Sequence, residues 1–164
     1  MTGNSVKAVY SGTFDPFTLG HRNVLERAAG LFGHVTVAVA ASTKKQTLFT
    51  LEERVAIAGS EAAGLSNVDV QPFSGLLRDF CLAGGYRVIV RGIRSGTDFN
   101  YESQMAGANK MLMPGVETVF LMTESPFEFV TSSAVREVGW LKGPLEGFVS
   151  PAVAAAVAAK FQKD

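Results

Sequence analysis

The sequence predicts an α/β fold, namely a Rossmann-like, doubly wound, five-stranded parallel sheet with helices on both faces. Short apolar runs alternate along the chain with segments of helical spacing, which is typical of successive strand–helix units. Most of each run is apolar rather than alternating with polar residues, which indicates strands buried on both faces of a parallel sheet. With 164 residues, 47% of them hydrophobic, the chain is long enough to form one domain with its own core, and we expect a single domain over residues 1–164.

The predicted strands are apolar runs rich in Val, Ile, Phe and Tyr, residues that favour extended backbone. In chain order they are Val6–Tyr10, Val35–Ala40, Val68–Gln71, Arg87–Val90 and Val116–Met122.

The first two predicted helices each carry an apolar face at helical spacing. One runs over Gly20–Phe32. The next begins behind Thr50, where Glu53 three residues later completes a capping box.

Four later segments complete the pattern, and each has a recognisable boundary. A short helix ends before two glycines, a longer one stops before Pro114, and the last begins at a Ser-Pro pair suited to the N-cap and first helical position. The four segments are Leu76–Leu82, Asp98–Met113, a helix from Thr131 or Ser132 to Trp140, and a helix from Ser150-Pro151 onward.

Charge and cysteine content narrow the function classes. Fifteen basic and fifteen acidic residues give a formal net charge of zero, which argues against a general nucleic-acid binder. A single cysteine, Cys81, excludes an intramolecular disulfide and fits a cytoplasmic protein. Because Cys81 lies in an apolar segment, we expect its thiol to be buried and not to act as a nucleophile. We see neither a secretory leader nor an apolar run of membrane-spanning length, so we expect no membrane partner.

In such sheets, ligands bind beyond the carboxyl ends of the strands. The segments that follow the predicted strands carry glycines, hydroxyls, His21, Lys44, Lys45 and two arginines. No Gly-Lys pair and no Gly-x-Gly-x-x-Gly after a strand are present, so neither a Walker-type loop nor a dinucleotide fingerprint is predicted. The sequence therefore predicts that any phosphate group is bound at this rim by another arrangement.

The segment Ser11–His21, SGTFDPFTLGH, is the richest of these loops. His21 falls in the first turn of the predicted helix, where free backbone N–H groups favour anions, and its ring can donate to a phosphoryl oxygen. Alone, His21 also fits a plain surface position on a helix, and Asp15 fits a simple turn cap.

Two further loops offer cations and hydroxyls. Arg91 and Arg94 suit planar recognition of phosphate, although ion pairs with Asp98 or Glu102 would explain them equally well. Adjacent lysines are usually solvated, so Lys45 carries little weight by itself. The Thr131-Ser-Ser-x-x-Arg136 run fits either a triphosphate site or ordinary N-caps.

Several motifs together resemble a known family. Thr18-x-Gly-His21 and Thr131-Ser-Ser-x-x-Arg136 are similar to the two signatures of the nucleotidylyltransferase superfamily. With SGTFDPFTLGH, FTLEERV, VRGIRSGTDFNYESQMAGANKML and FVTSSAVREV in order, the chain resembles the bacterial phosphopantetheine adenylyltransferases from Val6 to about Phe161.

The resemblance implies a single nucleotidylyltransferase domain over residues 1–164, and a reaction. ATP and 4′-phosphopantetheine would give dephospho-coenzyme A and pyrophosphate, the penultimate step of coenzyme A biosynthesis, by direct in-line displacement with His21 stabilising the transition state. It also implies Mg²⁺, a homohexamer, feedback inhibition by coenzyme A and a cytoplasmic location.

The resemblance assigns roles residue by residue. The catalytic set would be His21, Thr13, Lys45 and Arg94, and the phosphopantetheine site would use Thr13, Lys45, Ser74, Leu77 and Arg91. The ATP site would comprise Thr13, Phe14, His21, Gly92, Ile93, Arg94, Glu102, Phe127, Glu128, Phe129, Val130, Thr131, Ser132 and Ser133. The metal ligands stay unassigned.

Four positions depart from the family pattern without removing a catalytic group. Ser11 stands where Pro is more common, Thr131 replaces a serine and Asn100 stands where an acid is more usual. Thr18 replaces the first histidine of the superfamily signature, but this family commonly has Thr there. Two other functions stay open: a sister transferase acting on nicotinate mononucleotide or glycerol 3-phosphate, and a catalytically silent nucleotide-binding module.

Overall fold

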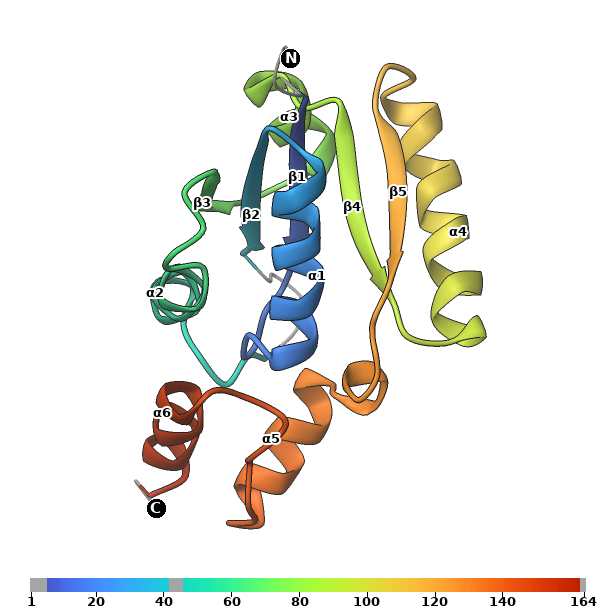
Figure 1. Ribbon diagram of the computed structural model, residues 1–164. Coiled ribbons are helices and arrows are strands. Elements are labelled where there is room, and N and C mark those ends of the chain that lie inside the picture. Colours follow the sequence, from blue (N-terminus) through green and yellow to red (C-terminus); the bar gives the residue numbers. More distant parts are fainter. Residues whose placement is uncertain (1–5, 42–45, 163–164) are drawn as a thin grey trace.

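The computed structural model describes residues 6–41 and 46–162, and it confirms the predicted fold class. Five strands form one sheet, in which every neighbouring pair is parallel, in the order β3-β2-β1-β4-β5 (Figure 1). The strands are β1 Lys7–Gly12, β2 His34–Ala40, β3 Val68–Phe73, β4 Val88–Ile93 and β5 Glu117–Met122.

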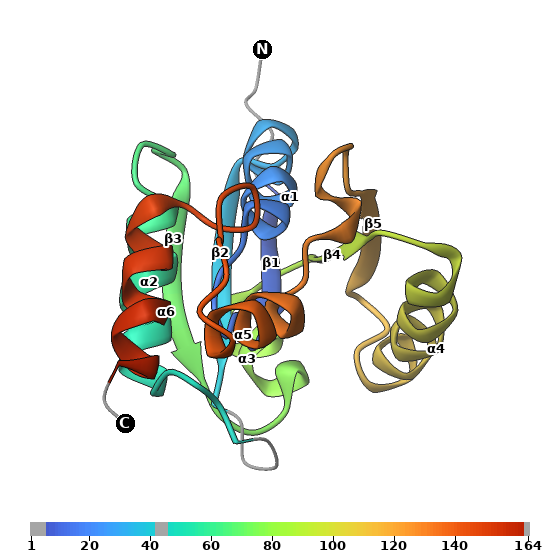
Figure 2. The same ribbon diagram turned by 90° about the horizontal axis from the view of Figure 1, so that it is seen from below.

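Helices cover both faces of the sheet and its carboxyl end. α1 and α2 pack on one face, α3 packs on the other, and α5 and α6 lie beyond the carboxyl ends of the strands (Figures 1 and 2). The elements are α1 Leu19–Leu31, α2 Leu51–Glu61, α3 Leu77–Gly84, α4 Gly96–Leu112, the 3₁₀ helix η1 Phe127–Phe129, α5 Ser132–Trp140 and α6 Pro151–Phe161. No described helix is both long and apolar enough to cross a membrane.

The strand order places a topological switch point between β1 and β4. From β1 the chain continues to β2 on one side, and from β4 it continues to β5 on the other. The connections that leave these two neighbouring strands therefore diverge and leave space between them at the carboxyl edge. The SGTFDPFTLGH segment begins in the last two residues of β1 and ends in the first turn of α1, and Arg94 follows β4 at this edge.

β4 is longer than the sequence predicts. The sequence predicts that this strand stops at Val90 and that Arg91 and Gly92 lie in a glycine-rich loop. This prediction is wrong. Arg91 pairs with Phe120 and Ile93 pairs with Met122 on β5, so the ladder extends three residues further. Gly92 has a packing reason as well, because a Cβ there would lie 3.0 Å from Val24 Cγ2 on α1.

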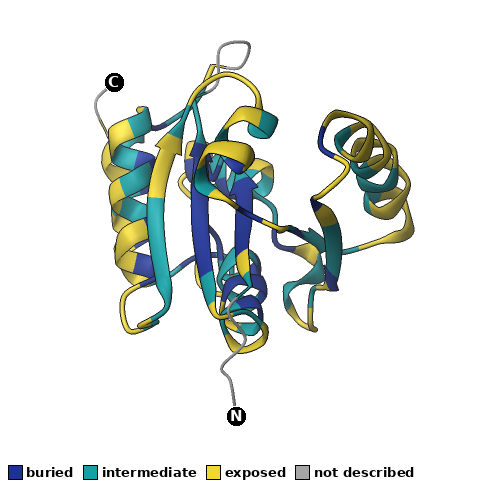
Figure 3. Cartoon of the chain, turned by 90° about the horizontal axis from the view of Figure 1, so that it is seen from above, coloured by how far each residue is buried: buried dark blue, intermediate teal, exposed yellow. Residues whose placement is uncertain are grey.

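Burial is uneven across the sheet. The central strands β1 and β2 are largely buried, whereas β3 has no buried residue and β5 has only Leu121 (Figure 3). The expectation that every strand is fully covered therefore holds for the centre and not for the edges, since an edge strand has a neighbour on one side only. α4 also has no buried residue, and its exposed apolar side chains are Phe99, Tyr101, Met105, Met111 and Leu112.

Two local predictions are confirmed. Thr50 and Glu53 form a reciprocal capping box at the start of α2, with hydrogen bonds of 3.2 and 2.8 Å. Cys81 is fully buried, and burial raises the pKa of its thiol to about 11, which suppresses the reactive thiolate at neutral pH.

The contact between α5 and α6 depends on a glycine. A Cβ on Gly139 would lie 2.5 Å from Val157 Cγ1, so we expect Gly139→Ala to lower the free energy of unfolding by about 1–3 kcal/mol through overpacking. The matched control is Gly59→Ala in α2, where a Cβ meets nothing within 4 Å. There we expect the lower backbone flexibility of alanine to raise the free energy of unfolding by about 0.5–1 kcal/mol. Urea unfolding measures both, and equal effects of the two substitutions would contradict the packing argument.

Candidate active site

A cleft of about 350 Å³ lies at the switch point, with walls from the segments after β1 and β4 and the start of α5. It contains eleven of the residues that the family resemblance assigns to the catalytic, acceptor or ATP site. They are Thr13, Phe14, His21, Arg91, Gly92, Arg94, Glu102, Val130, Thr131, Ser132 and Ser133.

Six other predicted site residues that the structure describes do not line this cleft. Ile93 is 1% exposed because it points into the core, and Phe129 is 80% exposed on the surface. Ser74 and Leu77 follow β3, two strands away from β1 in the sheet. Phe127 and Glu128 lie in η1 beside α1, and Glu128 Oε2 is buried without a hydrogen-bond partner among the described residues. Lys45 and its neighbour Lys44 lie outside the described residues.

His21 is fixed by an unusual capping box at the start of α1. The backbone N–H of Thr18 donates to His21 Nδ1 over 3.0 Å, and the backbone N–H of His21 donates to Thr18 Oγ1 over 3.2 Å. Because Nδ1 accepts a hydrogen bond from an amide, the neutral ring must carry its proton on Nε2. The imidazole is therefore oriented as a donor through Nε2.

The surroundings of His21 keep this ring neutral. Burial lowers its pKa to about 3, and the positive charges of Arg94 and Arg91 contribute in the same direction. The ring also packs against aromatic neighbours, with centroid distances of 5.0 Å to Phe14 and 5.3 Å to Phe17. A neutral ring in this pocket donates a hydrogen bond without giving up a proton.

Arg91 is held rigidly at the end of β4. Its Nε and Nη2 donate to the two carboxylate oxygens of Glu102, each over 2.7 Å, and Nη1 donates to the Ser11 carbonyl over 2.6 Å. Burial alone would lower the pKa of Arg91, but the hydrogen bonds and negative charge of Glu102 outweigh it and raise the pKa. The guanidinium group of Arg91 is thus permanently charged and is held in one orientation by its hydrogen bonds.

Arg94 is paired in the same way. Its Nε donates to Asp98 Oδ2 over 2.8 Å and Nη2 donates to Oδ1 over 3.1 Å. The sequence left ion pairs and a phosphate site as alternatives for Arg91 and Arg94, and the structure shows both pairs within the wall of the cleft. Pairing therefore orients the arginines at the site and does not remove them from it.

The hydroxyl groups of Thr131 and Ser132, at the start of α5, make different hydrogen bonds. Thr131 Oγ1 accepts from the Ala134 N–H over 2.9 Å and is an ordinary N-cap. Ser132 Oγ donates to the Pro16 carbonyl over 2.9 Å and so joins α5 to the turn after β1. Arg136 reaches the same turn, because its Nη1 donates to the Asp15 carbonyl over 2.6 Å.

Some residues of the site were missed in the sequence. Gln46, Thr47 and Thr123 line the cleft, and nothing in their local pattern distinguishes them. Arg54 lies just behind the cleft and had a usable signal: it occupies the apolar face of α2, three residues after Leu51 and four before Ala58, where a charged residue is unusual.

The arrangement is suited to phosphate groups. The Nε2 donor of His21, two charged arginines and the N-termini of α1 and α5 all meet at one cleft, although the formal net charge of the chain is zero. Helix N-termini and guanidinium groups both favour anions. Among residues 6–41 and 46–162, no three His, Cys, Asp or Glu side chains are grouped to hold a metal ion.

The chain matches known proteins in sequence. A cytidylyltransferase-like family model matches residues 9–138, which span both signature motifs. A phosphopantetheine adenylyltransferase from Acidovorax sp. is 53% identical over 148 residues, 90% of each chain. One from Methylobacillus flagellatus is 51% identical over 92% of this chain and 94% of that protein.

Solved structures agree on the fold. A Plasmodium falciparum nicotinic acid mononucleotide adenylyltransferase, solved with NaAD, matches 98% of this chain and 97% of its own with a TM-score of 0.69. A bifunctional NMN adenylyltransferase/ADP ribose pyrophosphatase from Francisella tularensis matches 98% of this chain and 51% of its own with a TM-score of 0.72. At 13% and 14% identity these two show a shared architecture only.

Sequence identity above one half over nine-tenths of the chain, together with a match to the cytidylyltransferase-like model, shows that this protein belongs to the phosphopantetheine adenylyltransferase family of nucleotidyltransferases.

Proposed function

We propose that this enzyme transfers the adenylyl group of ATP to 4′-phosphopantetheine and forms dephospho-coenzyme A and pyrophosphate, the penultimate step of coenzyme A biosynthesis. One observation carries the proposal: the neutral His21 ring, with its proton on Nε2, shares a cleft with two charged arginines. Relatives that share about half of their residues with this chain carry the same activity in their names.

The chemistry is a direct in-line displacement. An oxygen of the phosphopantetheine phosphate attacks the α-phosphorus of ATP, the bond from that phosphorus to the bridging oxygen breaks, and pyrophosphate leaves with the electron pair. The attacking phosphate is already ionised, so no general base is required. The main barrier is bringing two polyanions into line, which positioning and fixed positive charge lower.

His21 stabilises the transition state as a donor. Charge grows on the oxygens around the α-phosphorus during the displacement, and a fixed Nε2–H donor binds that charge more strongly than it binds the ground state. The lowered pKa of His21 supports this role, because the ring keeps the same proton through the reaction.

The other residues take the roles that the family implies. Thr13 would hold the α-phosphate together with His21, and Phe14, Gly92, Ile93, Arg94 and Glu102 would contact ATP. The η1 segment and the start of α5 would surround adenine and the outer phosphates. Lys45 and Arg91 would bind the acceptor phosphate, and Ser74 and Leu77 would contact a pantetheine arm that extends from the cleft toward β3.

Magnesium would enter as part of the substrate. No described group of side chains forms a metal cage of its own, whereas the phosphates of ATP bind Mg²⁺ readily and usually leave it several waters. We therefore propose Mg–ATP as the form that binds, with the ion lowering the repulsion between the two substrates.

Assembly and regulation follow the family as further proposals. The exposed apolar side chains of α4, among them Met111 at 85% exposure, support burial of this helix between subunits of a homohexamer. Coenzyme A contains both the pantetheine and the adenosine parts of the two substrates, which supports feedback inhibition at the same cleft. A step of coenzyme A biosynthesis also agrees with a cytoplasmic location.

The experiment that tests the proposed function is incubation with Mg–ATP and each of three acceptors, with pyrophosphate release as the readout. Release with 4′-phosphopantetheine, and formation of dephospho-coenzyme A, are the expected results. Release only with nicotinate mononucleotide or glycerol 3-phosphate would favour a sister transferase. Binding of ATP without release for any acceptor would indicate a silent nucleotide-binding module.

His21→Ala removes the fixed donor while α1 keeps its Thr18 cap. We expect kcat to fall by about 10²-fold or more, which is typical of losing one preorganised hydrogen bond to a transition state. Circular dichroism would show a folded variant. A kcat equal to that of the wild type would remove His21 from the mechanism.

The lowered pKa of His21 also predicts how stability depends on pH. Below pH 6.5 the unfolded chain binds a proton that the folded protein accepts only near pH 3, so the free energy of unfolding falls as the pH decreases. Between pH 7.5 and 5 we expect the wild type to lose up to roughly 2 kcal/mol more than His21→Asn, in which this group is gone. Urea unfolding at several pH values measures the difference, and parallel curves would contradict the neutral buried ring.

Lys45→Ala tests the acceptor assignment. If Lys45 binds the phosphate of 4′-phosphopantetheine, loss of its charge should raise KM for that substrate by about tenfold or more and leave KM for ATP nearly unchanged. Steady-state kinetics with each substrate varied in turn gives the comparison. A rise in KM for ATP alone would show that Lys45 serves the nucleotide instead.

A further inference from the structure

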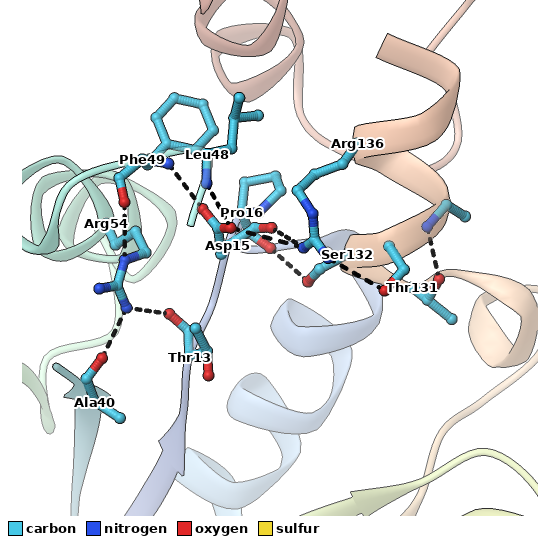
Figure 4. Close-up of polar contacts among 12 residues, drawn as sticks. Thr13, Asp15, Pro16, Ala40, Leu48, Phe49, Arg54, Thr131, Ser132 and Arg136 are labelled. Carbon is cyan, nitrogen blue, oxygen red and sulfur yellow. Dashed lines mark hydrogen bonds and ion pairs between the residues drawn. The ribbon is translucent and has the colours of Figure 1, made fainter. Parts of the chain in front are cut away.

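Arg54 is a buried arginine that contacts three separate segments of the chain. Only 3% of it is exposed. Its Nη1 donates to the carbonyls of Thr13 and Ala40, each over 2.8 Å, and its Nε donates to the Phe49 carbonyl over 3.2 Å (Figure 4). One guanidinium thus joins the turn after β1, the end of β2 and the segment that leads into α2.

This arginine is unusual because its described partners are uncharged. Within residues 6–41 and 46–162, no ion pair of the structure includes Arg54. A buried charge without a counterion is costly, so a role in packing alone would be served better by an apolar residue of similar size. Its charge, in contrast, is useful directly behind a cleft that receives anions.

Asp15 holds the same segment from the other side. Its carboxylate accepts the backbone N–H groups of Leu48 and Phe49 over 2.8 and 2.9 Å. Figure 4 shows the two side chains meeting the Phe49 backbone, Asp15 at its N–H and Arg54 at its carbonyl. The turn after β1 and the entry to α2 are therefore locked together at the back of the cleft.

The contact with Thr13 determines how one peptide group is turned. In a trans peptide the carbonyl and the N–H point in opposite directions, so a Thr13 carbonyl held by Arg54 directs the Phe14 N–H away from Arg54. Phe14 has a φ of +49°, a left-handed conformation that is costly for a bulky residue and needs support from its surroundings. Its ring gives part of that support by packing against Phe17 and His21, and the Arg54 hydrogen bond supports the peptide on the other side.

We propose that Arg54 is a positioning residue for catalysis: by holding the Thr13 carbonyl it presents the Phe14 N–H to the cleft as a phosphate donor, and its positive charge attracts the polyphosphate. Arg54 does not line the cleft, whereas Thr13 and Phe14 do. This inference rests on the proposed adenylyl transfer, because the donor is useful only if a phosphate binds there.

The kinetic test compares two substitutions at position 54 with two controls. Arg54→Lys keeps the charge without the planar fork of donors, and Arg54→Met removes both. Arg87→Lys changes an exposed arginine at the opposite end of β4, and Ile89→Ala creates a destabilising cavity in the core on the α3 face. For all four we would measure the unfolding temperature, the folded fraction, kcat, and KM for each substrate.

We expect kcat per folded molecule to fall about tenfold in Arg54→Lys and about 10²-fold in Arg54→Met, since a donor aimed at the transition state is misplaced. Arg87→Lys should behave as the wild type. Ile89→Ala should lower the unfolding temperature with kcat per folded molecule unchanged. An unchanged kcat in the folded Arg54 variants would overturn the proposal and leave Arg54 with a purely structural role.

A second measurement uses the wild type and so does not depend on a variant folding. The protein is labelled with ¹⁵N-phenylalanine, and the amide resonance of Phe14 is assigned from its absence in the Phe14→Tyr variant. We expect this resonance to shift when Mg–ATP is added. An unshifted resonance in a protein that is active would overturn the proposal. A wild type that binds Mg–ATP but releases no pyrophosphate with any acceptor would instead overturn the proposed function.

Discussion

The hydrogen bond from the Thr18 amide to Nδ1 of His21 is the interaction on which the site depends. It is one half of the capping box at the start of α1, assigns the ring proton to Nε2 and holds the ring at the switch point between β1 and β4. The same capping box therefore begins the helix and orients the His21 ring as a hydrogen-bond donor at the cleft. The low pKa of the ring follows first from its burial and then from the positive charges of Arg94 and Arg91, which line the same cleft.

Positive charge at this cleft is organised in two ways. Arg91 and Arg94 each have a carboxylate partner that orients them, Glu102 and Asp98. Arg54, behind the cleft, has only carbonyl partners among the described residues. A chain with no net charge can thus concentrate hydrogen-bond donors and positive charge at one edge of its sheet.

The uneven burial of the sheet fits this organisation. β1 and β2 are enclosed and hold the turn after β1 in place, whereas β3, β5 and α4 are more exposed (Figure 3). The turn that carries Thr13 therefore follows directly on one of the two most buried strands of the sheet. The apolar surface of α4 lies away from it, available for contacts beyond this chain.

The sequence by itself determined the strand–helix alternation, the Thr50–Glu53 cap, the buried Cys81 and the motifs that gather at the carboxyl edge, because each depends on neighbours within a few residues. Only the tertiary structure decided that β4 continues through Ile93, since its ladder with β5 joins residues about 30 positions apart in the sequence. It also decided that Arg54 reaches three carbonyls and that Arg91 and Arg94 are paired and yet line the cleft. Those contacts depend on how the elements pack against each other, which local patterns do not encode.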